Sequence, residues 1–298
     1  MKTVSYSQFS LYLQCPKRWK LDYADNLRKY DQNINTTFGS AFHSTIQNYV
    51  KVMYEESVKK ADEINLGEYL QECMMTEYKN ALLKNNNTHF TTAEQLSEYC
   101  QDGIAILDYF KKHRTAYFVS KQHTLLGIET PLNIPLRDGI RFTGFIDLIL
   151  RDERDGRIKI YDFKTSTAGW NKYQKADKSK TSQMILYKEF YAKQFNVDVE
   201  TIDIEYIIVR RKINEDLEFV PKRIQTFVPA NGKVTRNKIF KMFESFLNHC
   251  FTESGEYNLQ SEYPAIASSA CNYCPYQKED ALCAKKERIK LKDEAGVN

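Results

Sequence analysis

Residues 141–166 read RFTGFIDLILRDERDGRIKIYDFKTS, and this stretch decides the fold. Residues 142–150 are almost entirely apolar apart from Asp147, whereas residues 158–163 alternate more strongly between apolar and polar side chains. Between them, Asp155-Gly156 is a strong signal for a two-residue hairpin, because a type I′ turn needs positive φ at both central positions. The stretch therefore predicts two antiparallel strands joined by a tight turn.

A turn at Asp155-Gly156 pairs residues whose numbers add up to 311, which puts Asp147 opposite Lys164 and Ile149 opposite Asp162. Because side chains alternate along a strand, Asp147, Asp162 and Lys164 then share one face. The diagonal pair of carboxylates lies about 7–8 Å apart at the backbone, close enough to converge on one cation.

Two carboxylates within apolar strands are costly to bury unless they are paired or bind a metal. Mg²⁺ prefers a few hard oxygen ligands and keeps several waters, which two carboxylates on one face would satisfy. A lysine beside such a site would orient or deprotonate a water, or stabilise developing negative charge. An edge hairpin with an ordinary Asp–Lys cross-strand pair is the alternative, and these three residues alone do not decide between the two.

The composition excludes some classes of protein and leaves others open. The chain has 298 residues, enough to bury a sizeable core as one large domain or one domain with an insertion. Its 43 basic and 39 acidic residues give a net charge of +4, so any nucleic-acid surface must be local. No apolar run approaches the roughly 18 residues of a membrane-spanning helix, and the first residues contain no apolar signal region. We therefore expect a cytoplasmic protein without a membrane partner.

Hydrophobic periodicity predicts the remaining elements, with three- to four-residue spacing for helices and alternating or continuous apolar runs for strands. The helical patterns cover residues 5–25 (in two pieces broken near Cys15-Pro16), 37–61, 66–83, 91–113, 182–195 and 234–251, and the strand patterns cover residues 117–119, 124–134, 142–150, 158–163, 202–209 and 223–228. The helices at 66–83 and 91–113 look like a region inserted before the sheet, either a clamp over a single strand or scaffold.

Four further polar side chains indicate a functional site only when they are considered together. His43 lies beside the apolar stripe of the helix at 37–61, where the pattern alone favours an ordinary histidine at the edge of the core. Glu129, on the preceding strand pattern, is either a surface carboxylate or an additional acid near a metal. Gln183 and Tyr187 are four residues apart on one helix and so share a face, which a generic helix often provides.

The segment 165–180 combines basic and aromatic side chains. Lysines interleaved with aromatic rings suit a single-stranded nucleic acid, with phosphates on the lysines and bases on the rings. A solvated, flexible loop is the alternative. The candidate contact residues are Trp170, Lys172, Tyr173, Lys175 and Lys178.

Seven cysteines in a cytoplasmic chain are more typical of free thiols or metal ligands than of disulfides. Cys271 and Cys274 form a CxxC pair, and Cys283 follows after eight intervening residues. This spacing indicates a metal site that lacks one ligand, which Cys15 would supply from the other end of the chain and Cys250 would supply as an alternative. Four thiolates suit structural zinc as well as an iron–sulfur cluster, and unmetallated thiols are the third interpretation.

Three motifs in order resemble those of the PD-(D/E)XK nuclease superfamily. Gly144-Phe145-Ile146-Asp147 matches GxxD, Asp162-Phe163-Lys164 matches (D/E)xK, and Gln183 with Tyr187 matches QxxxY. Their separation resembles the RecB-like branch, which includes nuclease domains of bacterial helicase–nucleases, CRISPR adaptation nucleases, and phage and mitochondrial exonucleases. The resemblance implies an α/β, restriction-endonuclease-like core, in which helices flank a mixed central sheet, with an N-terminal helical insertion and a cysteine-stapled C-terminus.

The resemblance also assigns roles. The segment from Gly39 to His43 resembles the GxxxH helix whose histidine reaches the metal in RecB-like members. The ligands of Mg²⁺ or Mn²⁺ would be His43, Asp147, Asp162, the carbonyl of Phe163 and, as a further acid, Glu129. Lys164 would orient or activate the attacking water, and Gln183 and Tyr187 would position the substrate.

Iron-staple members of this branch hold a [4Fe–4S] cluster with one cysteine before the core and three at the C-terminus. The set Cys15, Cys271, Cys274 and Cys283 resembles this layout, although the last gap is longer than is usual in the family, and structural Zn²⁺ is the alternative. The implied segments are residues 1–36 with the first cluster cysteine, 37–115 with the His43 helix, 116–262 as the nuclease core and 263–298 as the cysteine-rich segment.

The activity that the resemblance implies is that of a metal-dependent deoxyribonuclease of a bacterial or phage-infected cell. It would be an exonuclease on single-stranded DNA or DNA ends, in recombination, repair or replication. An end-trimming endonuclease of the CRISPR-adaptation type and a non-catalytic DNA-binding subunit with a structural metal cluster are the alternatives. The sequence has no helicase P-loop, so any unwinding would come from a partner such as a helicase or a recombination protein.

Overall fold

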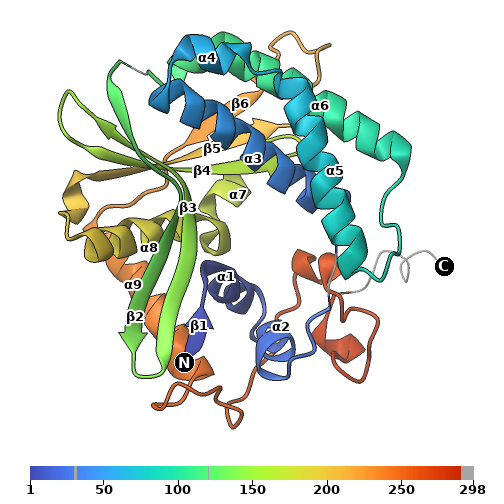
Figure 1. The fold of residues 1–298 in the computed structure, drawn as a ribbon. Coiled ribbons are helices and arrows are strands. Elements are labelled where there is room, and N and C mark those ends of the chain that lie inside the picture. The colour runs from blue at the N-terminus through green and yellow to red at the C-terminus, as the bar shows by residue number, and fades with distance from the viewer. Residues whose placement is uncertain (30–31, 120, 290–298) are drawn as a thin grey trace.

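One mixed sheet forms the centre of the protein in the computed structural model, which describes residues 1–29, 32–119 and 121–289 (Figure 1). In this part of the chain its strands are β1 (Lys2–Val4), β2 (His123–Arg137), β3 (Ile140–Asp152), β4 (Ile158–Ser166), β5 (Ile202–Arg210) and β6 (Ile224–Phe227). The strand order is β1-β3-β4-β5-β6, and β2 pairs with β3. The β1–β3 and β4–β5 pairs are parallel and the other pairs are antiparallel.

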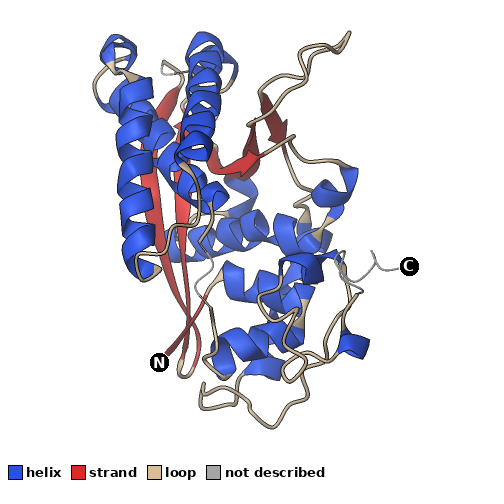
Figure 2. Ribbon diagram, turned by 90° about the vertical axis from the view of Figure 1, so that its right-hand side faces the viewer, coloured by secondary structure: helices blue, strands red, loops and turns tan. Residues whose placement is uncertain are grey.

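Helices cover both faces of this sheet. The α-helices are α1 (Tyr6–Gln14), α2 (Pro16–Trp19), α3 (Ile34–Glu55), α4 (Val58–Glu63), α5 (Leu66–Lys84), α6 (Ala93–His113), α7 (Lys172–Ala176), α8 (Lys178–Phe195) and α9 (Lys233–Cys250). A π-helical turn (Lys20–Ala24) and 3₁₀ turns (Arg114–Ala116, Val199–Thr201, Ser269–Tyr273, Lys285–Glu287) complete the described helical segments. Helices α1, α8 and α9 pack on one face, and α3, α5 and α6 pack on the other (Figure 2). The predicted α/β architecture, a mixed sheet between helices, is confirmed.

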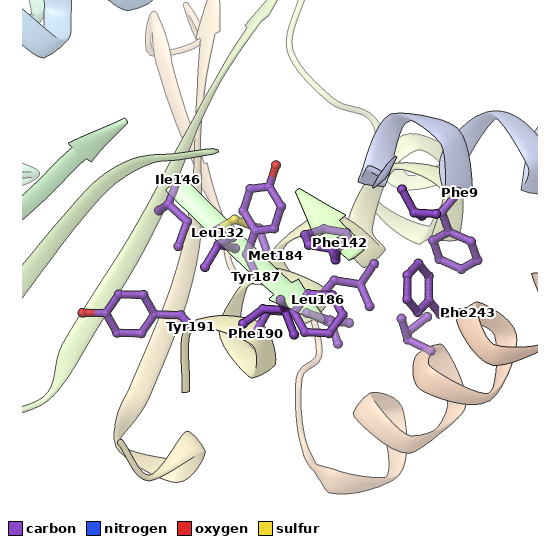
Figure 3. Packing of buried hydrophobic residues seen from close by; sticks show 14 of the residues in the cluster. Phe9, Leu132, Phe142, Ile146, Met184, Leu186, Tyr187, Phe190, Tyr191 and Phe243 are labelled. Carbon is purple, nitrogen blue, oxygen red and sulfur yellow. The ribbon is translucent and has the colours of Figure 1, made fainter. Parts of the chain in front are cut away.

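The face covered by α1, α8 and α9 is held by a large aromatic and aliphatic cluster (Figure 3). Phe142 of β3 is fully buried, with its ring centroid 4.4 Å from that of Phe190 on α8 and 6.0 Å from that of Phe243 on α9. Phe9 of α1 joins the same cluster, 5.2 Å from Phe243. Each such buried side chain contributes about 1.5–3 kcal/mol, so α8 is fixed against β3.

The opposite face is held by the apolar stripe of α3. The residues of this stripe, Phe38, Phe42, Ile46, Tyr49 and Met53, are all buried, as their spacing predicts. They share one cluster with Leu148 of β3 and Phe163 of β4. This packing presses α3, and therefore His43 on it, against the two strands. The helix ends at Glu55 rather than near residue 61, because the Ser57 side chain accepts a hydrogen bond from the Lys60 N–H and begins the separate helix α4.

The register predicted for the central hairpin is wrong by two residues. Leu148 pairs with Tyr161, so partner numbers add up to 309, and a four-residue loop joins the strands between Asp152 and Arg157. Gly156 does adopt a positive φ of 73°, but Asp155 does not. The Asp152 side chain accepts hydrogen bonds from the backbone and the guanidinium of Arg154, which stabilises the longer loop. A shift of two residues keeps every side chain on its predicted face.

Residues 117–119 were predicted as a strand and are not one. They follow the 3₁₀ turn Arg114–Ala116, and Phe118 is buried between the rings of Phe110 and Tyr161, at 5.8 and 5.4 Å. The segment is therefore apolar because it fills the core. None of the described helices combines the length and the apolar composition that crossing a bilayer requires.

Candidate active site

The candidate site lies where the central sheet splits. The pairing between β3 and β4 stops at Leu148 and Tyr161, yet β3 stays paired with β2 and β4 stays paired with β5 beyond this point. The two strands therefore diverge, and the β2–β3 hairpin curves away from β4 and β5 (Figure 1). Asp147 and Asp162 are the next residues after the last pair, so both carboxylates lie at the point of divergence.

Asp147 links the two strands and faces the helix α3. Its Oδ2 accepts a hydrogen bond from the Phe163 N–H at 2.8 Å, and Nδ1 of His43 lies 3.6 Å from the same oxygen. The His43 ring also packs edge-on against the Phe163 ring, with 6.1 Å between the centroids. The structure thus brings together His43, Asp147 and the backbone of Phe163, three of the predicted metal-site residues.

Asp162 is almost completely buried, with 2% of its surface exposed. Nζ of Lys164 lies 2.7 Å from its Oδ2, so this buried oxygen has a cation beside it. Lys164 is two residues further along β4, on the same face, as the strand alternation predicts.

Burial raises the pKa of both carboxyls to about 6, in each case against the opposing effect of the Lys164 charge. The charge of Asp147 raises the pKa of Asp162 further. The single positive charge of Lys164 therefore does not neutralise the negative charges of two buried carboxylates. Two buried carboxylates beside a single lysine supply hard oxygen donors of the kind that Mg²⁺ or Mn²⁺ prefers.

His43 adds a neutral nitrogen to this set. Burial lowers the pKa of its imidazole, and the Lys164 charge lowers it further, against the effects of Asp162, Glu129 and a hydrogen bond to the Phe163 backbone. A neutral ring keeps a lone pair that can bind a metal.

Gln47 is a site residue that the sequence reasoning missed. It is 7% exposed, and its Nε2 donates to Oε1 of Glu129 at 2.5 Å and lies 3.4 Å from the carbonyl oxygen of Asp147. Glu129 has a φ of 48°, in the left-handed region that non-glycine residues rarely adopt. The available signal was spacing, because Gln47 follows His43 by four residues on α3 and so shares its face.

Gln183 and Tyr187 reach the site from α8, on the opposite layer. Both are buried, at 8% and 6% exposed. A Cβ added to Gly144 would lie 3.1 Å from the Tyr187 ring, so the glycine of the GxxD motif makes room for this tyrosine. Burial first, and then the charge of Asp162, raises the pKa of Tyr187, which keeps its hydroxyl protonated as a donor.

The family model of the PD-(D/E)XK nuclease superfamily matches residues 3–279. The chain belongs to the PD-(D/E)XK nuclease superfamily. Members of this superfamily are nucleases that cleave phosphodiester bonds and typically use Mg²⁺ or Mn²⁺. Among curated proteins, the comparison finds no match.

The predicted nucleic-acid residues of this PD-(D/E)XK protein separate into two groups. Trp170 is buried, with its ring centroid 5.0 Å from Tyr206 and 6.2 Å from Phe227, so no base can stack on it in this conformation. Tyr173, by contrast, is 73% exposed. The lysines of this set lie beside it, with Lys172 and Lys175 on α7 and Lys178 at the first position of α8.

The four predicted cluster cysteines lie near one another, although they come from both ends of the chain. The negative charges of Cys15 and Cys271 contribute to the raised pKa of Cys274, after burial, and those of Cys15 and Cys274 contribute to that of Cys283. Cys250, the alternative ligand, is fully buried, and the charges acting on these thiols do not include it.

Contacts between the C-terminal segment and the α2 region place these cysteines. The Tyr276 hydroxyl donates to Asp22 at 2.6 Å, and Lys17 pairs with Glu287 at 2.7 Å. Within residues 1–29, 32–119 and 121–289, however, no three His, Cys, Asp or Glu side chains form a group that could hold a metal ion. This holds for His43, Asp147, Asp162 and Glu129 as well as for the cysteines, so the ligand sets of the divalent cation and of the iron–sulfur cluster or zinc all stay predictions.

Proposed function

We propose that this PD-(D/E)XK protein is a metal-dependent DNA exonuclease of the RecB-like branch that acts on single-stranded DNA or DNA ends. The observation that carries the proposal is the meeting of Asp147, Asp162 and Lys164 where β3 and β4 diverge. A binding subunit with a degenerate site would not need to keep two buried carboxylates whose burial is unfavourable.

Asp147 and Asp162 would hold the divalent cation, with His43, the Phe163 carbonyl and Glu129 as further donors. A bound Mg²⁺ or Mn²⁺ would stabilise negative charge that develops on the phosphate and make an attacking water more acidic. Glu129 is kept in reach of Asp147 by Gln47.

The other side chains would act on the substrate. Lys164 presents an ammonium group beside Asp162, where it can orient a water or compensate charge on a phosphate oxygen. Gln183 and Tyr187 present an amide and a protonated hydroxyl from α8, which can donate hydrogen bonds to phosphate. Lys172, Tyr173, Lys175 and Lys178 would contact the strand outside the site.

We further propose that Cys15, Cys271, Cys274 and Cys283 bind a [4Fe–4S] cluster, with structural Zn²⁺ as the alternative metal. The support is the proximity of these thiols and the family layout of one early and three late cysteines. The cluster would tie α2 to the C-terminal segment and would have a structural role. A cytoplasmic location and a helicase or recombination protein as partner belong to the same proposal.

Digestion of end-labelled single-stranded DNA with Mg²⁺, with Mn²⁺ and with EDTA tests the nuclease proposal. Wild type should degrade the DNA only with a divalent ion, and Asp162→Ala should abolish degradation. Asp155→Asn, on the exposed loop of the same hairpin, is the matched control and should behave as wild type.

The form of the products separates the remaining possibilities. A ladder that shortens from one end gives the polarity of an exonuclease, whereas cleavage of circular single strands would indicate an endonuclease. Binding of DNA without cleavage under both metals, in protein that retains its cysteine-bound metal, would replace the nuclease by a DNA-binding subunit.

A further inference from the structure

A groove of about 630 Å³ is lined entirely by residues outside the motifs of the superfamily. Its walls come from four parts of the chain: the end of α1, the turn from α7 into α8, helix α9, and the C-terminal segment. Its lining includes the apolar side chains of Leu13, Met242 and Ile266 and the rings of Tyr173 and Tyr273.

The two tyrosines of this groove present their rings to solvent. Tyr173 is 73% exposed and Tyr273 is 80% exposed, and they come from elements a hundred residues apart in the sequence. Most large aromatic side chains of this protein are buried, so two exposed rings that line one groove need an explanation. Flat rings that face a groove are platforms on which nucleic-acid bases stack.

Helix α1 packs against the start of α8 beside the groove. The side chains of Tyr6 and Ser10 both donate to the carbonyl oxygen of Ser179, and Gln14, one turn further, lines the groove. The Tyr6 hydroxyl is within range of two charges, those of Asp162 in the site and Asp177 at the groove. Tyr6 therefore links the candidate site to the groove lining.

The charge around the groove suits a polyanion. Lys178 and Lys180 belong to the groove lining, and Nζ of Lys172 lies 5.1 Å from the centroid of the Tyr173 ring. The one acid of the groove lining, Asp177, is used internally, because its Oδ1 accepts from the N–H and the hydroxyl of Ser179, each at 2.8 Å. Lysines and exposed rings that line one groove suit a single strand, with phosphates on the lysines.

We propose that this groove binds a single nucleic-acid strand of the substrate, with bases stacked on Tyr173 and Tyr273. The inference rests on the proposed nuclease function and assigns its substrate path. It places the C-terminal segment, through Tyr273, in direct contact with the substrate.

Binding of labelled oligo(dT) to the full-length Asp162→Asn protein, measured by fluorescence anisotropy, tests the groove without cleavage. Tyr273→Ala and Tyr173→Ala should each weaken binding by about five- to a hundredfold, the range for loss of one stacked base. Tyr273→Phe keeps the ring and should bind as the parent. Phe219→Ala removes an exposed ring (83%) from the β5–β6 loop and is the matched control.

The salt dependence separates stacking from charge. Lys178→Ala should reduce the slope of log K against log salt by about one, whereas the tyrosine variants should keep the slope of the parent. Parent-like affinity of both tyrosine-to-alanine variants, or an equal loss for duplex DNA, would overturn the proposal. If instead wild type cleaves no DNA while the tyrosine effects persist, the nuclease proposal fails and the groove stands as a binding site.

Discussion

Asp147 accepts a hydrogen bond from the backbone N–H of Phe163, with 2.8 Å between Oδ2 and the nitrogen. The contact joins β3 to β4 directly beyond their last paired residues, Leu148 and Tyr161. A carboxylate of the candidate site therefore also replaces a ladder hydrogen bond where the sheet splits. An amide oxygen could keep the hydrogen bond, but it would not keep the charge.

Substitution of Asp147 should separate these two roles. Asp147→Asn and Asp147→Ala should both abolish nuclease activity, because each removes a metal-binding charge. Only the alanine variant leaves the buried N–H of Phe163 without an acceptor, which costs roughly 1–3 kcal/mol. Urea unfolding in EDTA should therefore show Asp147→Ala to be less stable than Asp147→Asn by about this amount. Equal stabilities would mean that the hydrogen bond does not tie the strands.

Asp162 should destabilise the protein at neutral pH when no divalent ion is supplied. Its folded-state pKa of about 6 lies above the ordinary value of 3.8, chiefly because of burial. A raised pKa means that stability is fully present below about pH 4 and is lost as the pH rises through about 6. In EDTA, Asp162→Asn should therefore melt above wild type at pH 8, and the difference should shrink towards zero as the pH falls to about 4.

Adding Mg²⁺ tests the same two proteins, wild type and Asp162→Asn, in a second way. The ion should raise the melting temperature of wild type at pH 8, because a ligand that binds only the folded state stabilises it, and should leave Asp162→Asn unchanged. If Asp162→Asn melts below wild type at pH 8 in EDTA, the charged Asp162 does not destabilise the metal-free protein. That result would contradict its assignment as a buried carboxylate that binds a cation.

Lys164→Met should lose activity without losing metal. The ammonium group lies 2.7 Å from Asp162, so it repels a cation bound by the same carboxylate. Removing one charge that stabilises the transition state typically costs about 10²–10³ in kcat. Titration calorimetry should meanwhile show Mg²⁺ affinity equal to or greater than that of wild type. Loss of metal binding would instead make Lys164 a structural residue of the site.

Gln47→Leu should reduce activity although the residue belongs to no superfamily motif quoted for this chain. The amide holds Glu129 at 2.5 Å, and groups that orient metal ligands typically contribute 10–100-fold to metal affinity or activity. A rise in the Mg²⁺ concentration needed for half-maximal rate is the expected measurement. Asn48→Ala, the next amide on α3, is half-buried and should behave as wild type.

The cysteine site can be tested by metal content. Protein purified without oxygen should contain iron and sulfide in the proportions of a cluster, or one zinc per chain if the alternative holds. Cys15→Ser should lower the metal content and the melting temperature, because the metal joins distant parts of the chain. Cys73→Ser, a cysteine of α5 outside the site, should retain both. Retention of metal in Cys15→Ser would exclude Cys15 as a ligand.

Part of the candidate site could be predicted because side-chain alternation in a strand is local. Asp147, Asp162 and Lys164 were placed on one face from a hairpin register that was wrong by two residues. A shift of two residues preserves the alternation on which this expectation rests, and the charge of Asp147 does raise the pKa of Asp162. The order and spacing of the three motifs likewise identify the superfamily, as the match over residues 3–279 confirms.

Other features depended on packing between distant residues. Trp170 lies in a segment whose composition predicts a binding loop, and Phe118 lies in an apolar segment that predicts a strand. Both side chains instead fill the core. Gln47 shares a helix face with His43. This spacing indicates a site residue only because the Gln47 amide donates a hydrogen bond to Glu129 in the folded structure.

Periodicity and motif order in the sequence were enough to predict most helices, most strands and the superfamily, although α7 was missed and α8 begins at Lys178 rather than at residue 182. These follow from periodicity and motif order, which are properties of short stretches. The tertiary structure alone decided where β3 and β4 part, how α3 and α8 reach the gap from opposite layers, and how the C-terminal segment meets α7 across a groove. Those relations arise from contacts between residues tens to hundreds of positions apart, for which local dihedral preference and hydrophobic pattern carry no information.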